Sequence, residues 1–138
     1  MQAVAGAVQA GPPTAGTINF SGQITIPPDP AATSFNLLWM VSGSAFLNPM
    51  GPVGLLSCMV TISGTGESTL STSATWKLEY VRVSSHEALP MLMLHTQWPA
   101  GTYNVSIVGI DPNSFWDLND TMQVAVVELD HTGIGGGQ

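Results

Sequence analysis

Charged side chains are scarce in this chain of 138 residues, where Asp, Glu, Lys and Arg together make up 8%. A soluble domain usually has about 25%. Only Lys77 and Arg82 are dependably basic, against nine acidic residues, so the formal net charge is −7. Binding to nucleic acid through its phosphates needs clustered Lys and Arg, and docking on an anionic membrane needs a similar cluster. The sequence therefore predicts neither a nucleic-acid partner nor a membrane partner.

Cysteine and long apolar runs are also lacking. Cys58 is the one cysteine, which excludes an intramolecular disulfide and a metal site built from several thiolates. It lies in the apolar run Val53–Ile62, where a small buried thiol is expected. No stretch of about 20 apolar residues occurs, so no transmembrane helix is expected.

Catalytic motifs are absent as well. His86, His95 and His131 are far apart and show no ligand spacing such as His-x-x-x-His. The nucleophile elbow Gly-x-Ser-x-Gly is also missing. We therefore expect no enzyme activity, no catalytic residues, no metal site and no cofactor.

One acidic loop, Asp111–Asp120, is dense in oxygen ligands. Such a loop could bind calcium, but the EF-hand spacing fails because no Glu closes it. Asp and Asn also favour turns through local hydrogen bonds to the backbone. We interpret the loop as a turn, with calcium binding as the alternative. Its candidate ligands are Asp111, Asn113, Asp117, Asn119 and Asp120.

Alternation of apolar and polar residues is the strongest signal that is present. In the stretch Trp98–Ile110, Tyr103, Val105 and Ile107 alternate with polar residues, which is typical of a strand with one buried face. Further runs of this kind predict about eight strands and hence an all-β antiparallel sandwich, jelly-roll-like or, as the alternative, immunoglobulin-like. The predicted strands are Thr17–Ile26, Ser34–Val41, Leu55–Ile62, Glu67–Ser71, Ala74–Val83, Pro90–His95, Thr102–Ile110 and Thr121–Asp130.

Composition divides the chain into three segments. Residues 1–16 are rich in Ala, Gly and Pro and lack the basic start and long apolar core of a secretory signal. We interpret them as an arm that is flexible or ordered by a neighbouring subunit. Residues 17–131 are expected to form a single β-sandwich domain. Residues 132–138 are a Gly-rich tail.

Large aromatic side chains in turns are the main candidates for contact with a partner. Trp98 lies just before a predicted strand, and Phe115 and Trp116 lie in the acidic loop. Such side chains either fold back to cap the sandwich, which we favour, or face a partner. Together with Pro12 and Pro13 of the N-terminal arm, they are the candidate partner-docking residues.

One short segment, Gly16-Thr-Ile-Asn-Phe-Ser-Gly-Gln-Ile24, resembles the start of chaperone–usher fimbrial subunits. In that family, a Gly-Thr-Val/Ile-x-Phe-x-Gly-x-Ile strand follows a donor extension. The resemblance implies a subunit of an extracellular fibre that assembles by strand exchange. Those subunits carry a disulfide, which this chain cannot form.

The profile of the whole chain resembles the capsid decoration (cement) proteins of tailed bacteriophages. It is small, all-β and acidic, and its ends are apolar and bear Gly and Pro. Low charge suits a protein of an assembly, because long charged side chains are costly to order and desolvate. The resemblance implies a homo-oligomer on the virion surface that binds the major capsid protein or other assembly subunits and stabilises the shell. A calcium- or carbohydrate-binding β-sandwich module is a further alternative.

Overall fold

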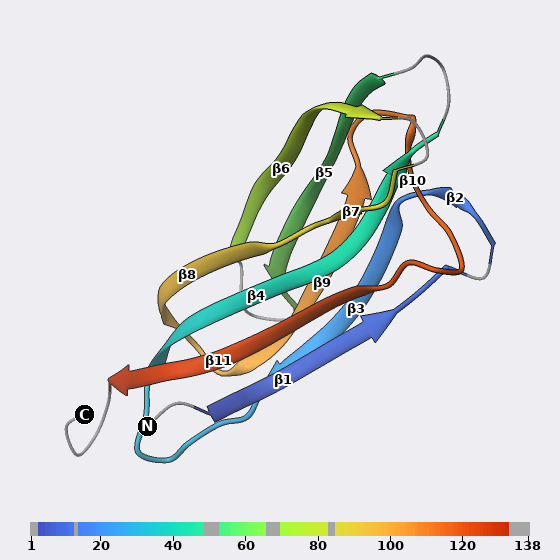
Figure 1. Ribbon diagram of the computed structural model, residues 1–138. Helices are drawn as coiled ribbons and strands as arrows, with labels where there is room; N and C mark the ends of the chain where they lie inside the picture. Colours follow the sequence, from blue (N-terminus) through green and yellow to red (C-terminus); the bar gives the residue numbers. More distant parts are fainter. Residues whose placement is uncertain (1–2, 13, 49–52, 66–69, 83–84, 133–138) are drawn as a thin grey trace.

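The computed structural model describes residues 3–12, 14–48, 53–65, 70–82 and 85–132. Every regular element in these residues is a β-strand, and the strands form two antiparallel sheets that face each other (Figure 1). The predicted all-β antiparallel sandwich is therefore confirmed. Across the described residues, no helix is long and apolar enough to cross a membrane.

Four strands make the main part of the first sheet. Strand β1 (Ala3–Ala10) pairs with β11 (Met122–Thr132), β11 pairs with the long β4 (Ser34–Leu47), and β4 pairs with β8 (Met91–Trp98). The first and last described strands of the chain therefore lie side by side (Figure 1). The edges of this part of the sheet are β1 and β8.

Three very short strands extend the first sheet at the C-terminal end of β4. Strands β7 (Glu87–Ala88) and β10 (Ser114–Trp116) both pair with β4, and β2 (Gly16–Thr17) pairs with β10. Their pairing brings the segments before β8 and before β11 to the same end of the sandwich.

The second sheet has four strands in the order β3, β9, β5 and β6. Strands β3 (Asn19–Ile26) and β5 (Val53–Gly64) both pair with β9 (Gly101–Gly109), and β6 (Ser71–Arg82) pairs with β5. The central strand β9 is the one whose alternation was clearest in the sequence.

The core lies between the sheets and is built from alternate residues of each long strand. Tyr103, Val105 and Ile107 of β9 are buried, as the period of two predicted. Trp39 of β4 is completely buried, and its ring centre lies 5.9 Å from that of Tyr103 and 6.2 Å from that of Trp98. Because a fully buried large apolar side chain contributes about 1.5–3 kcal/mol, this aromatic cluster is a major source of stability.

The N-terminal segment differs from its prediction. It was expected to be an arm outside the sandwich, but Ala3–Ala10 forms β1 and pairs along its length with β11. Glycine lets β1 approach β3 of the other sheet closely: a Cβ atom at Gly22 would lie 2.6 Å from Val8 Cγ2, and one at Gly6 would lie 2.6 Å from Ile24 Cγ2. The segment was missed because its Ala and Gly residues show little contrast between the two faces of a strand.

Two strand boundaries also differ. Strand β4 runs on to Leu47, through residues that were expected to form a loop. Gly43 lets the strand pass β11 closely, because a Cβ atom at this position would lie 2.6 Å from Met122 Sδ. The predicted strand Glu67–Ser71 falls largely outside the described residues, and Ser71 begins β6. Thr132 of the predicted tail ends β11, and the remainder of that tail is outside the described residues.

Candidate functional site

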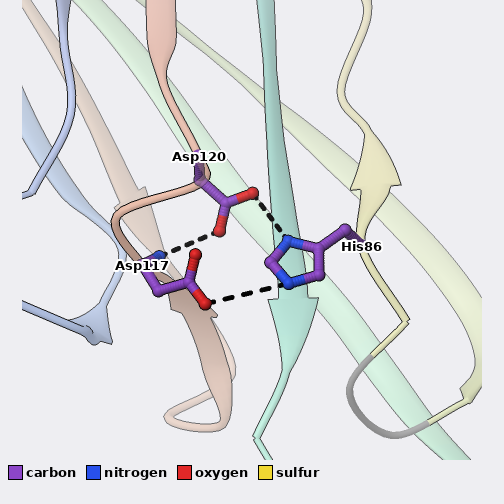
Figure 2. Close-up of side chains that lie close together, drawn as sticks. All are labelled: His86, Asp117 and Asp120. Atoms are coloured by element: carbon purple, nitrogen blue, oxygen red, sulfur yellow. Dashed lines mark hydrogen bonds and ion pairs between the residues drawn. The ribbon is translucent and has the colours of Figure 1, made fainter.

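Three side chains with metal-ligand chemistry converge at the end of the sandwich where the short strands lie (Figure 2). They are His86, just before β7, and Asp117 and Asp120, in the turn between β10 and β11. His86 Nδ1 lies 2.8 Å from Asp120 Oδ1, and His86 Nε2 lies 3.8 Å from Asp117 Oδ2. No such convergence was expected from the sequence, since the histidine and the carboxylates are brought together by the pairing of β7 and β10 with β4.

The acidic loop folds through hydrogen bonds between its own carboxylates and backbone. Asp111 Oδ1 accepts from the N–H of Asn113 at 2.9 Å, and Asp117 Oδ1 accepts from the N–H of Asn119 at 2.9 Å. Asp120 Oδ2 accepts from the N–H of Asp117 at 2.9 Å. The bonds of Asp111 and Asp117 are those of Asx turns, and the bond of Asp120 closes the segment from residue 117 to residue 120, so the structure assigns a turn-forming role to the loop. Three of the five predicted calcium ligands, Asp111, Asp117 and Asp120, therefore each use one carboxylate oxygen to accept a hydrogen bond from the backbone of the loop.

Asp120 is the buried member of the cluster, with a side chain that is 0% exposed. Its carboxylate accepts hydrogen bonds from Ser44 Oγ at 2.5 Å, from His86 Nδ1 at 2.8 Å and from the N–H of Asp117. Burial raises the pKa of Asp120, but the hydrogen bonds from Ser44, His86 and Asp117 outweigh that effect and hold its pKa below the ordinary value. Asp120 is therefore an ionised carboxylate inside the fold, stabilised by donors from three segments.

Two chemical roles of the cluster can be compared with its geometry, a metal site and a catalytic Ser–His–Asp triad. One atom from each of His86, Asp117 and Asp120 lies within 4.8 Å of the other two, a set that could hold a divalent ion such as zinc. A Ser–His–Asp arrangement is not formed, because Ser44 donates to the carboxylate of Asp120 and not to the imidazole. All three side chains are already hydrogen-bonded or ion-paired to one another. We interpret the cluster as a polar clasp that ties the segment before β7 to the turn before β11.

The residues predicted to dock on a partner are mostly inside the sandwich. Trp98 and Trp116 are buried, the first against Tyr103 and the second edge-on to Phe20. Phe115 is half-buried. Pro12 is also buried, and Pro13 lies outside the described residues. The structure brings none of these described side chains together as an exposed surface, and their burial agrees with the capping role that was favoured for the aromatic residues.

His95 shares the environment of Trp98. The two rings are stacked, with centres 4.3 Å apart and an angle of 6° between their planes. Burial lowers the pKa of His95 from its ordinary value of 6.5. Its Nδ1 atom is buried without a hydrogen-bond partner among the described residues. The imidazole is therefore held in its neutral form against the indole.

This environment predicts a pH dependence of stability. With a folded pKa below 6.5, the unfolded chain binds more protons than the folded chain just below pH 6.5. The contribution of His95 is present above pH 6.5 and is lost as the pH falls through the folded pKa. Thermal unfolding at pH 7.5 and 5.5 should show a smaller drop in Tm for His95→Phe, which keeps an aromatic ring, than for the wild type. Equal drops in the two proteins would contradict the assignment.

An exposed surface that the sequence analysis missed lies on the outer face of the first sheet. Core residues of β4, β11 and β8 alternate with apolar residues that point outward, in two rows across the strands. In one row Leu38 is paired with Leu94 and Val127, and in the other Met40 is paired with Leu92 and Ala125. Leu92 and Leu94 are 68% and 59% exposed. We call these six residues the apolar strip: Leu38, Met40, Leu92, Leu94, Ala125 and Val127.

The outer face of the second sheet is more polar, although Met59 is paired with Val108 on it. Its central rows are polar: Ser21 is paired with Ser106, and Gln23 with Asn104, to which its side chain donates a hydrogen bond of 2.9 Å. The signal for the apolar strip was present in the sequence, since Leu37–Val41 and Met91–Leu94 are apolar at every position. A strand of an antiparallel sheet that is apolar on both faces has more apolar surface than one core can bury.

Comparison with known proteins yields a fold but no family. No protein-family model matches the chain, and no curated protein matches it. Among solved structures, it is similar to a chain of infectious bursal disease virus, Gx strain, with a TM-score of 0.53 and 12% identity over 91% of this chain and 32% of the viral chain. It is also similar to the VP2 subviral particle of that virus, with a TM-score of 0.49, 14% identity and coverage of 91% and 32%.

A third similar structure is TmCBM61 in complex with β-1,4-galactotriose, with a TM-score of 0.40, 11% identity and coverage of 87% of this chain and 68% of that protein. The chain spans about a third of the length of the viral chains that it matches. At 12% identity, the likeness to the Gx-strain chain shows a shared fold: this chain has a β-sandwich of a kind found in a virus particle.

Proposed function

We propose that this chain is a structural, non-catalytic protein of a virus particle that docks on the capsid shell through the apolar strip. The observation that carries the proposal is the contrast between the two outer faces. One presents Leu, Met and Val in two rows, whereas the central rows of the other present Ser, Asn and Gln. A monomeric soluble protein rarely exposes a contiguous apolar surface, and such a surface is typical of an interaction site.

Three further observations support this role. The fold is shared with a chain of a virus particle. The strip carries no formal charge, so a partner covering it would not need to desolvate an ionised side chain. The one polar cluster of ionisable groups found in the described residues, His86, Asp117 and Asp120, is arranged as a clasp between segments and lacks a nucleophile activated by a base.

The proposed mechanism is mechanical. A rigid sandwich on the virion surface, as in a decoration or cement protein, would bridge neighbouring copies of the major capsid protein and add buried area across their joints. Covering one exposed leucine of the strip contributes up to about 1.5–3 kcal/mol. Because the chain would bind the assembled shell and not the free subunits, its binding free energy would stabilise the shell by linkage.

Sedimentation tests the docking surface. Particles from the source of the chain are stripped of it, and the purified chain is added back before centrifugation through sucrose. Wild-type chain should sediment with the particles. Met40→Glu should reduce the bound fraction about tenfold or more, because docking would then desolvate an unpaired charge. Circular dichroism of the free variant establishes that it is folded.

Ser21→Glu is the matched control, since it places the same charge on the polar face of the other sheet. It should sediment like the wild type. Wild-type chain that stays in the supernatant, or Met40→Glu that binds as strongly as the wild type, would overturn the proposal.

A further inference from the structure

The free edge of β8 is unlike the other outer strand edges in the described part of the chain. Strand β8 pairs with β4 on one side and with no described strand on the other. Its eight residues, Met-Leu-Met-Leu-His-Thr-Gln-Trp, include no Lys, Arg, Asp, Glu or Pro. An uncharged apolar edge with unpaired backbone groups is a template for pairing with another strand, and proteins normally blunt such edges with charges or Pro.

The contrast with the other sheet edges shows that this chain does protect an edge elsewhere. Strand β6, the edge of the second sheet, carries Lys77, Glu79 and Arg82, and therefore both basic residues of the chain. Strands β1 and β3 are uncharged like β8, but they pack closely against each other at Val8 and Gly22. On β8, neither device is present.

We infer that β8 pairs with β8 of a second copy of this chain, antiparallel and about a two-fold axis at Met93. A second copy fits this edge because the apolar side chains of β8 would meet the same apolar side chains, with no charged residue of β8 between them. Each copy carries a net charge of −7, so self-association is opposed wherever acidic residues would meet, and β8 brings none opposite another. A two-fold contact of this kind is isologous, so it closes at a dimer and leaves no further free β8 edge.

The position of the axis follows from the regular part of β8. Met91–His95 is in continuous register with β4, and the register shifts before Trp98. Gln97 marks that irregularity with a φ of 60° and an N–H that donates to Asn36 Oδ1 at 3.2 Å. Such a bulge bends a strand edge and ends pairing. The five regular residues are centred on Met93, which places Leu92 of each copy opposite Leu94 of the other.

The pairing also joins the two apolar strips. Leu92 and Leu94 lie at the β8 end of the two rows, so edge-to-edge pairing would continue both rows from one copy into the next. Cross-strand pairs of large apolar side chains contribute roughly 0.2–1 kcal/mol each beyond the backbone hydrogen bonds. The inference stands without the proposed docking on a shell, because it concerns only the edge of one strand.

Directed cross-linking tests this arrangement. Residues directly opposite in an antiparallel pair have Cα atoms about 4.5–5.5 Å apart, within the range that a disulfide spans. Leu92→Cys and Leu94→Cys are made as separate proteins, mixed, and treated with mild oxidant. The mixture should yield covalent dimers, whereas each variant alone should yield few, because its new thiols would face leucines. Cys58 does not compete, since it is buried and burial raises its pKa to about 12.

Solution mass provides the second readout. Sedimentation equilibrium should show a dimer for the wild type, and Leu92→Lys/Leu94→Lys should shift it to monomer by placing like charges together. Val127→Lys is the matched control, because it places a charge in the apolar strip away from the β8 edge. This variant should remain dimeric, although it should impair docking on the capsid shell. A monomeric wild type, a dimer that the double lysine variant leaves intact, or a mixture that does not cross-link would each overturn the inference.

Discussion

Replacing Asp120 by alanine is expected to lower the free energy of unfolding by about 3 kcal/mol at pH 7. The buried carboxylate accepts hydrogen bonds from Ser44, His86 and the backbone N–H of Asp117. Hydrogen bonds to a charged group contribute about 1.5–3 kcal/mol, and their loss would leave these donors without their partner. Urea unfolding followed by circular dichroism measures the change.

Asp117→Ala is the control for this prediction. Asp117 meets His86 at 3.8 Å and is partly exposed, and the hydrogen bond that it accepts from the N–H of Asn119 is exposed to solvent. Its replacement should therefore cost only about 1 kcal/mol. A loss of stability in Asp117→Ala equal to that in Asp120→Ala would show that the buried carboxylate is not the centre of the clasp.

The ionised state of Asp120 also predicts how the difference in stability between wild type and Asp120→Ala depends on pH. The folded pKa of Asp120 lies below its ordinary value of 3.8, so its contribution is fully present above pH 3.8 and is lost as the pH falls through the folded pKa. The two proteins should therefore approach each other in stability below pH 3.8. A difference that persists unchanged to lower pH would contradict the ionised state assigned to Asp120.

Replacing Trp39 by alanine should cost about 3–5 kcal/mol, because it removes the largest fully buried side chain and leaves a cavity between the sheets. The cavity would open beside Trp98 and Tyr103, whose rings pack against Trp39. Chemical denaturation with intrinsic fluorescence measures the loss, and a cost below about 1 kcal/mol would contradict the central place given to this residue.

Trp39→Phe separates packing from hydrogen bonding. The indole Nε1 of Trp39 is buried without an acceptor in the described part of the chain. Phenylalanine keeps an aromatic ring and removes that unpaired donor, which itself costs free energy on burial. The Phe variant should therefore retain most of the stability that the Ala variant loses.

The architecture could be predicted from the sequence because the core-forming strands alternate clearly. In β9, Tyr103, Val105 and Ile107 are buried where the pattern placed them. Strand β1 could not be predicted in the same way, since Ala and Gly fit either face of a sheet. Its place depends on two close approaches, at Gly6 and Gly22, that only the three-dimensional arrangement shows.

The functional surfaces were harder to predict than the strands. The clasp depends on residues 34 positions apart, His86 and Asp120, that meet because short strands pair at one end of β4. The apolar strip depends on which strands lie side by side, which the runs Leu37–Val41 and Met91–Leu94 do not state by themselves. The aromatic residues Trp98 and Trp116 attracted attention as docking candidates, but the fold uses them to close its own core.

Electron cryo-microscopy of particles isolated from the source of this chain tests the central claim most directly. The proposal predicts a two-layer β-sandwich at repeated positions on the particle surface, with Leu38 and Met40 turned toward the shell protein. Two results together would contradict a structural role on the virion. The maps would account for every surface density without this sandwich, and the chain would be recovered only in the unassembled fraction.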